Sequence, residues 1–157
     1  MGCDIHTYAE VFVDGQYALQ DLNDLLLNSR GPFDWRCYAM YGFLADVRNY
    51  SAIPPLAQPR GLPHDVSHEV SSQFHCGYHT PSWLSVDELR NFDYTQPVEN
   101  RRCMVQLGPN SASGSGTCAE GKGHMATYRD LLSKEFVRDL KVLVNAKTSR
   151  VVFWFDN

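Results

Sequence analysis

The sequence predicts an α+β fold: a mainly antiparallel sheet that includes strands from both ends of the chain, covered by two main helices, with short helices and long loops. Three observations carry this prediction. Polar and apolar residues alternate over residues 3–13, the pattern of a strand with one buried face. Apolar residues recur at helical spacing over residues 34–47 and 128–144. Residues 151–155 are uniformly apolar, as in a central strand.

The first half of the chain supplies its own turn and cap signals. Asp14-Gly15 follows the first strand and favours a two-residue hairpin turn, which predicts a return strand over residues 17–19. Asp34 is a favourable N-cap for the helix over residues 34–47. Prolines recur between residues 52 and 63, so we expect an irregular but semi-rigid loop there.

The second half predicts two more helices and a long loop. Asp65 is the expected cap of a short helix over residues 65–74, and residues 85–88 form a capping box that opens another. Residues 108–123 are rich in Gly and Ser and predict a loop. Thr127 is the expected cap of the last helix. We expect residues 1–157 to form a single domain that carries this loop.

Composition excludes several classes of protein. The chain has 157 residues, of which 43% are hydrophobic and 20% charged, and its net charge is −4. A net acidic chain is a poor candidate for sequence-independent nucleic-acid binding, which needs a basic face. No apolar run approaches the ~20 residues that span a bilayer, and the N-terminus lacks a signal pattern. We therefore expect a cytoplasmic protein without membrane association.

A row of polar side chains follows the first strand. The two-residue period of a strand places Asp4, His6, Tyr8 and Glu10 side by side on one face. Two carboxylates, an imidazole and a phenol can bind a metal, carry out acid–base chemistry or hydrogen-bond a ligand. The same alternation is also typical of a strand face that points to solvent, so both interpretations stay open.

Four of the six histidines lie within one short segment: His64, His68, His75 and His79. In each of the two pairs the histidines are four residues apart, a spacing that places two imidazoles on one helix face and is typical of metal ligands. Pro63, Gly77 and Pro81 interrupt a continuous helix across both pairs. We therefore expect no bound metal and no cofactor. One or two of these histidines are expected to contact a ligand.

Three further segments place binding groups where the backbone is irregular but held by proline, glycine or a helix cap: Arg48-Asn49-Tyr50, Arg60 within residues 59–63, and Ser82-Trp83. Binding residues are commonly held in this way. Arginines, aromatic rings and an amide together suit a nucleotide-like anion. The alternative for Arg60 is that it bonds to carbonyls of its own loop.

Several longer motifs carry a resemblance to a known family. They are Met1-Gly2-Cys3-Asp4-Ile5-His6, residues 44–49 (LADVRN), residues 59–63 (PRGLP) followed by residues 65–67 (DVS), His79 with residues 82–84 (SWL), and residues 152–157 (VFWFDN). With these motifs the chain resembles a family of small proteins found mainly in bacteriophage genomes. The resemblance leaves out residues 108–123.

The resemblance implies a phage setting, and therefore the cytoplasm of a host bacterium, without a known activity. By analogy, a small phage accessory protein with a polar pocket would neutralise a host nucleotide immune signal. Joined to the motifs, the residue patterns select nine candidate ligand-binding residues: Asp4, His6, Arg48, Asn49, Arg60, Asp65, His79, Ser82 and Trp83.

Three functional hypotheses remain open. In the first, the protein sequesters a phosphorylated, nucleotide-like small molecule. In the second, it is an enzyme that cleaves such a molecule, a phosphodiesterase for example, with His6 and His79 as acid and base. In the third, it is a protein–protein inhibitor, because residues 1–100 hold thirteen acidic and five basic side chains and could cover a basic host surface. A homo-oligomer is compatible with each hypothesis.

Overall fold

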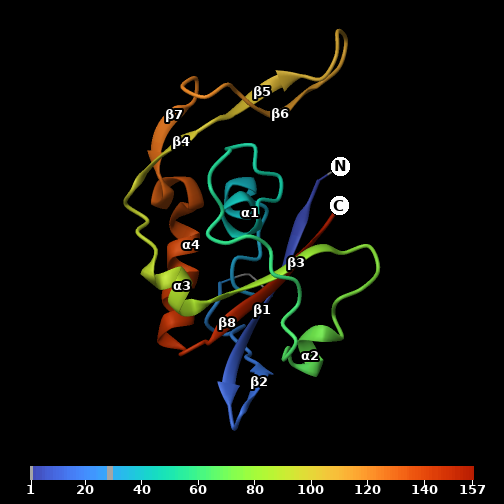
Figure 1. Ribbon diagram of the computed structural model, residues 1–157, viewed down its shortest axis with the longest axis vertical. Coiled ribbons are helices and arrows are strands. Elements are labelled where there is room, and N and C mark those ends of the chain that lie inside the picture. The colour runs from blue at the N-terminus through green and yellow to red at the C-terminus, as the bar shows by residue number, and fades with distance from the viewer. Residues whose placement is uncertain (1, 28–29) are drawn as a thin grey trace. The chain divides into compact units, whose positions relative to one another are not determined.

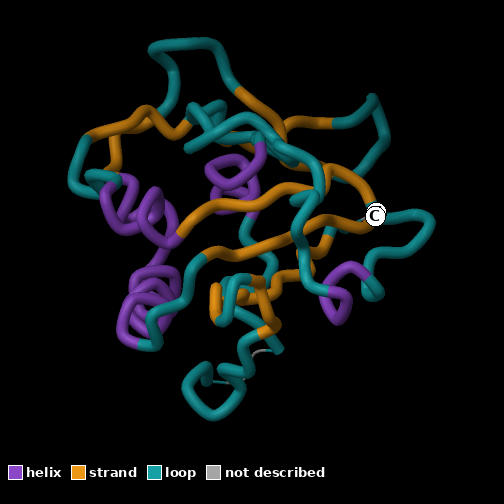
Figure 2. The backbone as a smooth tube through the Cα atoms, turned by 60° about the horizontal axis from the view of Figure 1, so that its bottom comes forward, coloured by secondary structure: helices purple, strands orange, loops and turns teal. Residues whose placement is uncertain are grey.

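The computed structural model describes residues 2–27 and 30–157. The sequence predicts one domain, and in the structure the chain groups into two compact units, each built from segments that are distant in the sequence. Unit 1 comprises residues 1–36, 57–92 and 134–157, and unit 2 comprises residues 37–56 and 93–133. Loops connect short helices and strands throughout (Figure 2). No helix in the described part of the chain combines the length and the apolar character needed to cross a membrane.

Unit 1 contains a four-stranded antiparallel sheet with the strand order β2-β1-β8-β3. The strands are β1 (Asp4–Val13), β2 (Gln16–Leu19), β3 (His79–Ser85) and β8 (Arg150–Asp156). Figure 1 shows β1, β8 and β3 running side by side. The predicted antiparallel sheet with both terminal strands is therefore confirmed, and the apolar β8 is central, as its sequence predicts. The predicted turn is present, with positive φ angles of 51° at Asp14 and 80° at Gly15.

The strand register divides this sheet into two faces. His6 lies opposite Trp154, whereas His79 lies opposite Phe155. Successive residues of a strand point to opposite sides, so His6 and His79 belong to different faces. We call these the His6 face and the Phe155 face.

The His6 face is covered by apolar side chains that come mainly from residues 62–78. Its buried centre is Val70, Val152 and Trp154, and the half-buried side chains packed around it are Tyr8, Leu62, Val66, Phe74, Tyr78 and Trp83. The short helix α2 (His68–Ser71) lies in this covering segment. Burial of this cluster supplies the hydrophobic stabilisation that holds the segment on the sheet.

Two predicted helices of unit 1 form, one with its expected cap. The helix α3 (Val86–Asn91) begins with the predicted capping box between Ser85 and Glu88. The expected cap of α2, Asp65, is wrong: Ser67 caps this helix and accepts the Val70 N–H. The reason is that Asp65 bonds to an arginine from the other end of the chain, as described below.

Helix α1 (Tyr38–Ala45) begins later than the sequence predicts. Its N-cap is Cys37, without a side-chain hydrogen bond, so the expected cap Asp34 is wrong. The Asp34 carboxylate instead accepts the backbone N–H of Arg30 at 3.2 Å. Phe33 has a positive φ of 64°, which turns the chain just before Asp34 and separates it from the helix.

Unit 2 contains α1 and two small antiparallel sheets, one of β4 (Pro97–Asn100) with β7 (His124–Thr127) and one of β5 (Arg102–Gln106) with β6 (Ser113–Thr117). The predicted loop over residues 108–123 is therefore corrected, because β6 lies inside it. A Cβ atom at Gly116 would stand 2.6 Å from Cγ1 of Val105 in β5. The glycines that resemble a loop in the sequence are thus needed for close strand packing.

The last helix, α4 (Tyr128–Asn145), forms where the sequence predicts it. The Thr127 hydroxyl accepts the Asp130 N–H at 3.2 Å, which confirms the predicted cap. Ser133 interrupts the helix with φ 81° and ψ 162°. This break coincides with the boundary in sequence between unit 2 and unit 1.

Candidate functional site

A groove of about 600 Å³ follows the N-terminal half of β1 in unit 1, and we call it the β1 groove. Its walls come from β1, from residues 30–34 and from residues 73–78. The lining residues are Asp4, Ile5, His6, Thr7, Tyr8, Arg30, Asp34, Gln73, His75 and Tyr78. The volume lies within the range of small-molecule sites in proteins, roughly 300–1,000 Å³.

The groove exists because β1 has a partner on only one side over its first half. β8 pairs with β1 from Asp4 to Glu10, whereas β2 pairs with β1 only from Glu10 to Val13. Residues 30–34 approach the open edge, where a Cβ atom on Gly31 would clash with the Thr7 carbonyl oxygen. Glycine at position 31 therefore allows this wall to lie directly against the strand.

His6 is held at the groove by the last strand of the chain. Its Nε2 atom lies 3.0 Å from Oδ2 of Asp156, and the two side chains are 31% and 36% exposed. Asp156 also accepts the backbone N–H of Asp4 at 3.3 Å. A carboxylate that bonds one ring nitrogen fixes the orientation of an imidazole and leaves its other nitrogen, here Nδ1, for a second hydrogen bond.

Aromatic rings line the groove next to His6. The centre of the Tyr78 ring lies 4.8 Å from that of His6 and 5.9 Å from that of His75. Tyr8 stacks on the buried Trp154 with 4.8 Å between the ring centres. Burial raises the pKa of the Tyr8 hydroxyl, and Tyr78 and Asp34 raise it further. The Tyr8 hydroxyl is therefore protonated at neutral pH and can donate a hydrogen bond.

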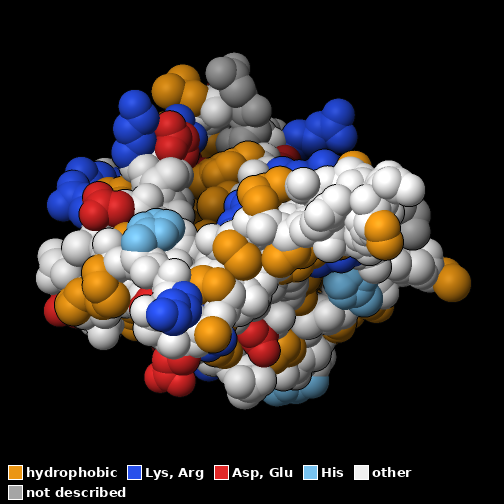
Figure 3. Space-filling view, turned by 90° about the horizontal axis from the view of Figure 1, so that it is seen from above, with side chains coloured by type: hydrophobic (Ala, Val, Ile, Leu, Met, Phe, Trp, Pro, Cys, Tyr) orange, Lys and Arg blue, Asp and Glu red, His pale blue; other side chains and the backbone are white. Residues whose placement is uncertain are grey.

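Charges of both signs surround the groove. Asp4 is neutralised by Arg36, whose Nε and Nη2 atoms each donate to its carboxylate at 2.8 Å. The other charged side chains that line the groove are Asp34 and the exposed Arg30. Arg30 has no carboxylate partner among the described residues. On the surface drawn in Figure 3, described Lys and Arg side chains also lie among Asp and Glu rather than in one broad basic area.

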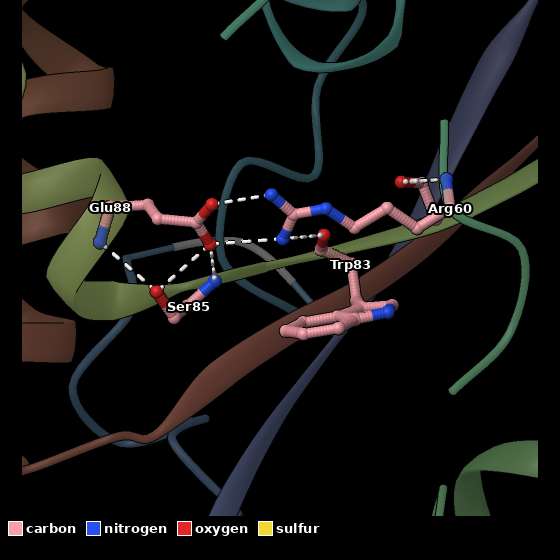
Figure 4. A network of polar contacts seen from close by, with 5 residues as sticks. Arg60, Trp83, Ser85 and Glu88 are labelled. Atoms are coloured by element: carbon pink, nitrogen blue, oxygen red, sulfur yellow. Dashed lines mark hydrogen bonds and ion pairs between the residues drawn. The ribbon is translucent and has the colours of Figure 1, made fainter. Parts of the chain in front are cut away.

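Three of the expected ligand-binding residues form a separate network in unit 1 (Figure 4). The Arg60 guanidinium makes a two-point ion pair with Glu88 and donates to the Trp83 carbonyl at 3.3 Å. It also lies 4.7 Å from the centre of the Trp83 ring, while the Arg60 N–H bonds to Ser82 Oγ at 3.1 Å. Hydrogen bonds from Arg60 lower the pKa of Glu88 to about 2. Arg60 therefore ties its loop to β3 and α3 through groups outside the loop, whereas the alternative interpretation expected bonds to carbonyls of the loop itself.

Glu10 and Asp65 both bond to the buried Arg150; Glu10 is fully buried, whereas the Asp65 side chain is 44% exposed. The Arg150 guanidinium bonds to Glu10 and to Asp65, each at 2.7 Å, and lies 3.4 Å from the centre of the Tyr17 ring. The second Glu10 oxygen accepts the Ser67 N–H at 2.8 Å. Hydrogen bonding to Arg150 lowers the pKa of Asp65. Both carboxylates therefore already have hydrogen-bond partners within the protein.

His79 lies on the other side of the sheet from the β1 groove. Its ring stacks on Phe155 at 6.0 Å between centres, and Nδ1 lies 2.9 Å from the Thr80 hydroxyl. An irregularity in the strand pairing between His79 and Ser82 precedes the regular part of β3. Since the sheet separates His79 from His6, the expected acid–base pair of these two histidines is corrected.

Arg48 and Asn49 are in unit 2. The Asn49 amide donates to Asp46 Oδ1 at 2.6 Å and to the Ile53 carbonyl at 2.7 Å, and its oxygen accepts the Ile53 N–H at 3.2 Å. These bonds close the loop that follows α1. Arg48 donates to the Tyr50 hydroxyl at 3.5 Å. Asn49 is thus a structural residue.

Of the nine expected ligand-binding residues, the groove contains Asp4 and His6. The structure adds groove residues that sequence reasoning missed: Arg30, Asp34, Gln73, Tyr78 and, beside His6, Asp156. In the sequence, His75 stands out only as a member of the histidine segment, and Asp156 only as part of the final motif. Among the described residues, no three His, Cys, Asp or Glu side chains come together as potential metal ligands.

Comparison with known proteins adds no relative. No protein-family model, curated protein or solved structure matches this chain. The function is therefore inferred from the chemistry of the β1 groove.

Proposed function

We propose that this protein binds a small, phosphorylated, nucleotide-like molecule in the β1 groove and sequesters it. The observation that carries the proposal is a group of three planar rings, Tyr78 with His6 at 4.8 Å and His75 at 5.9 Å between ring centres, in a groove that also contains Arg30. Planar side chains stack on nucleobases whatever the base, at about 1–3 kcal/mol per base.

The other groove residues supply the polar contacts that such a ligand needs. The Arg30 guanidinium can bond a phosphate through two parallel N–H groups. Such bidentate hydrogen bonds between charged groups are among the strongest that a protein makes to a phosphate. The Asp34 carboxylate and the Gln73 amide can bond the edge of a base, and the Tyr8 hydroxyl can donate to a ribose or phosphate oxygen. Arg36 offsets the charge of Asp4, which reduces repulsion of an anion.

The motifs at residues 1–6, 59–63 and 152–157 support a phage setting for this proposed function. They resemble a family of small phage proteins, and a phage benefits when a host nucleotide immune signal is removed from solution. Sequestration needs only a groove that binds more tightly than the host receptor does. We therefore propose an anti-defence role for the groove, in the host cytoplasm.

The test is binding by protein purified without an affinity tag. Isothermal titration calorimetry with AMP, cyclic dinucleotides, cyclic trinucleotides and ADP-ribose derivatives should reveal at least one ligand. Tyr78→Ala and Arg30→Ala should each weaken its binding about tenfold, the loss of ~1.4 kcal/mol. Arg90→Ala, which removes an exposed arginine of unit 1 outside the groove, should have no effect.

Heat release separates sequestration from its alternatives. Protein incubated with the ligand is heated, and the supernatant is analysed by chromatography. Intact ligand in the supernatant supports sequestration. If no ligand of the panel is retained, the proposal fails and inhibition of a host protein becomes the better hypothesis.

The His6–Asp156 pair favours a second candidate, cleavage of the same ligand. An imidazole held by a carboxylate is a competent general base, and Nδ1 of His6 could take the proton of a water that attacks phosphorus as the P–O ester bond breaks. New products after heat release, lost in His6→Asn by about 10²–10⁴-fold, would establish this function instead. The leaving oxygen would then take its proton from a group other than His79, which is across the sheet.

A further inference from the structure

Unit 2 contains a cluster of two arginines and two tyrosines that is separate from the β1 groove. We call it the Arg–Tyr cluster, and its members are Tyr38, Arg48, Tyr50 and Arg102. The Tyr38 and Tyr50 rings lie 5.7 Å apart, edge to face. The Arg102 guanidinium lies 5.8 Å from the centre of the Tyr38 ring, and Arg48 donates to the Tyr50 hydroxyl at 3.5 Å. Two guanidinium groups thus flank one aromatic pair.

The loop that carries Arg48 is held in an unusual backbone conformation. Asp46, Arg48 and Ala52 all have positive φ angles, between 47° and 58°. Non-glycine residues rarely adopt this region because it brings the Cβ atom close to the backbone, so surrounding contacts must hold the loop in place. The Asn49 amide, which bonds Asp46 and Ile53, keeps the loop in this form.

Hydrogen bonds to the neighbouring strands fix the position of the loop within unit 2. The Ser51 carbonyl accepts the Arg101 N–H at 3.0 Å, immediately before β5 begins. The Tyr50 carbonyl accepts the Thr117 hydroxyl at 2.8 Å, at the end of β6. These two bonds place Tyr50 at the start of β5 and the end of β6, so the cluster is built by three elements rather than by chance exposure of a flexible side chain.

Arg102 lacks the acidic partner that would satisfy it. Its guanidinium donates to the Ser115 hydroxyl at 2.9 Å and faces the Tyr38 ring, and the described residues give it no carboxylate. The nearest acidic residue of the loop, Asp46, already accepts the Asn49 amide. An exposed arginine beside half-buried tyrosines and hydroxyl groups is suited to a phosphate next to a planar ring.

We infer that the Arg–Tyr cluster is a second binding site, for one nucleotide unit. Arg48 and Arg102 bind the phosphate, and the base stacks on the exposed parts of Tyr38 and Tyr50. The inference is independent of the β1 groove, since it uses no residue of unit 1. The same chemistry is offered by a free nucleotide and by one unit of a single-stranded nucleic acid; the net charge of −4 favours the free nucleotide, and the test includes both.

The experiment measures fluorescence anisotropy of a labelled deoxythymidine hexamer, with AMP as an unlabelled competitor. The full-length protein should bind the hexamer, and Arg102→Ala should weaken binding about tenfold. Arg102→Lys, which keeps the charge but loses the planar group that stacks on Tyr38, should recover only part of the loss. Lys122→Ala removes an exposed charge of unit 2 outside the cluster and is the matched control.

The outcomes separate this site from its alternatives. Displacement by AMP assigns a free nucleotide, and binding of the hexamer without displacement assigns a single strand. Absence of hexamer binding overturns the inference. So does equal weakening in Arg102→Ala, Arg102→Lys and Lys122→Ala, which would indicate non-specific attraction. The groove variant Tyr78→Ala should bind the hexamer normally, so failure of the groove proposal leaves this result intact.

Discussion

The two ends of one face of β1 carry similar side chains in very different settings. Glu10 is fully buried at one end, where Arg150 and the Ser67 N–H satisfy its carboxylate. His6 lies at the other end, is 31% exposed and pairs with Asp156 at the edge of a groove. Alternation along the strand places both on the same face. The segments packed against that face determine which of the two side chains is buried and has a structural role.

The difference lies in desolvation. A buried carboxylate is tolerated only when every oxygen has a partner, and Glu10 meets this demand with two partners from distant segments, Arg150 and the Ser67 N–H. The His6–Asp156 pair remains in contact with water, so it costs little to form and contributes little to stability. It is therefore free to change partners when a ligand arrives. Stability and binding should separate along this one strand.

The largest effect is expected at the buried end. Arg150→Ala leaves the buried Glu10 carboxylate without its cation, and we expect the free energy of unfolding to fall by about 3–5 kcal/mol. Urea denaturation followed by circular dichroism measures the change. The double variant Glu10→Leu/Arg150→Met, which removes both charges, should be closer to the wild type than Arg150→Ala is. If Arg150→Ala has the same free energy of unfolding as the wild type, the Arg150 network does not stabilise the fold.

A smaller effect is expected at the wall of the groove. Gly31→Ala places a Cβ atom against the Thr7 carbonyl oxygen, a backbone atom that can move only with β1. We expect a loss of about 1–3 kcal/mol and weaker ligand binding, because residues 30–34 must move away from the strand. In Gly2→Ala the new Cβ would meet only the end of the Arg36 side chain, so this control should lose less. Equal losses in both variants would contradict the close approach at Gly31.

Local signals in the sequence predicted local structure well. The alternation before Asp14-Gly15 predicted β1 and its hairpin, and the capping box at Ser85 and Glu88 predicted the start of α3. The interactions that define these features span a few residues, so the sequence displays them directly. Asp34 and Asp65 misled as helix caps because each had a different hydrogen-bond partner, which no local pattern shows.

The candidate site could be predicted only in part, because its contacts join distant residues. The alternating strand predicted the face on which His6 lies, but its partner Asp156 is 150 positions away. His79 was grouped with His6, yet strand pairing places it on the opposite face of the sheet. Arg60 looked available for an anion, whereas Glu88, 28 positions later, already binds it. Pairing register and ion-pair choice decide a site, and both are tertiary properties.

A third effect concerns the Arg60–Glu88 pair and has a defined pH dependence. Hydrogen bonds from Arg60 lower the pKa of Glu88 from 4.5 to about 2 in the folded chain. A lowered carboxyl pKa stabilises the fold above the unfolded value, and this contribution is lost as pH falls from about 4.5 toward 2. Glu88→Gln keeps the capping box but removes the charge, so it should cost about 1 kcal/mol at pH 7, after allowance for solvent screening.

The measurement is urea unfolding of the wild type and Glu88→Gln at several pH values between 7 and 2. The difference between the two proteins should be constant down to about pH 5 and should shrink below it. Ligand binding in the β1 groove should be unchanged in Glu88→Gln, because the pair lies outside the groove. A difference in stability that grows as the pH falls would contradict the assigned direction of the shift.

The smallest effect on stability is expected at the exposed end, where the effect on binding should be the greater. Asp156→Asn weakens the contact that orients His6, but both side chains reach water, so the free energy of unfolding should change by only about 0.2–1 kcal/mol. Binding of the groove ligand should weaken about tenfold, because the imidazole no longer holds one orientation. Calorimetry and urea denaturation of the same preparation measure both quantities. A variant that loses several kcal/mol of stability, or binds the ligand as the wild type does, would show that the two ends of the β1 face do not differ in the proposed way.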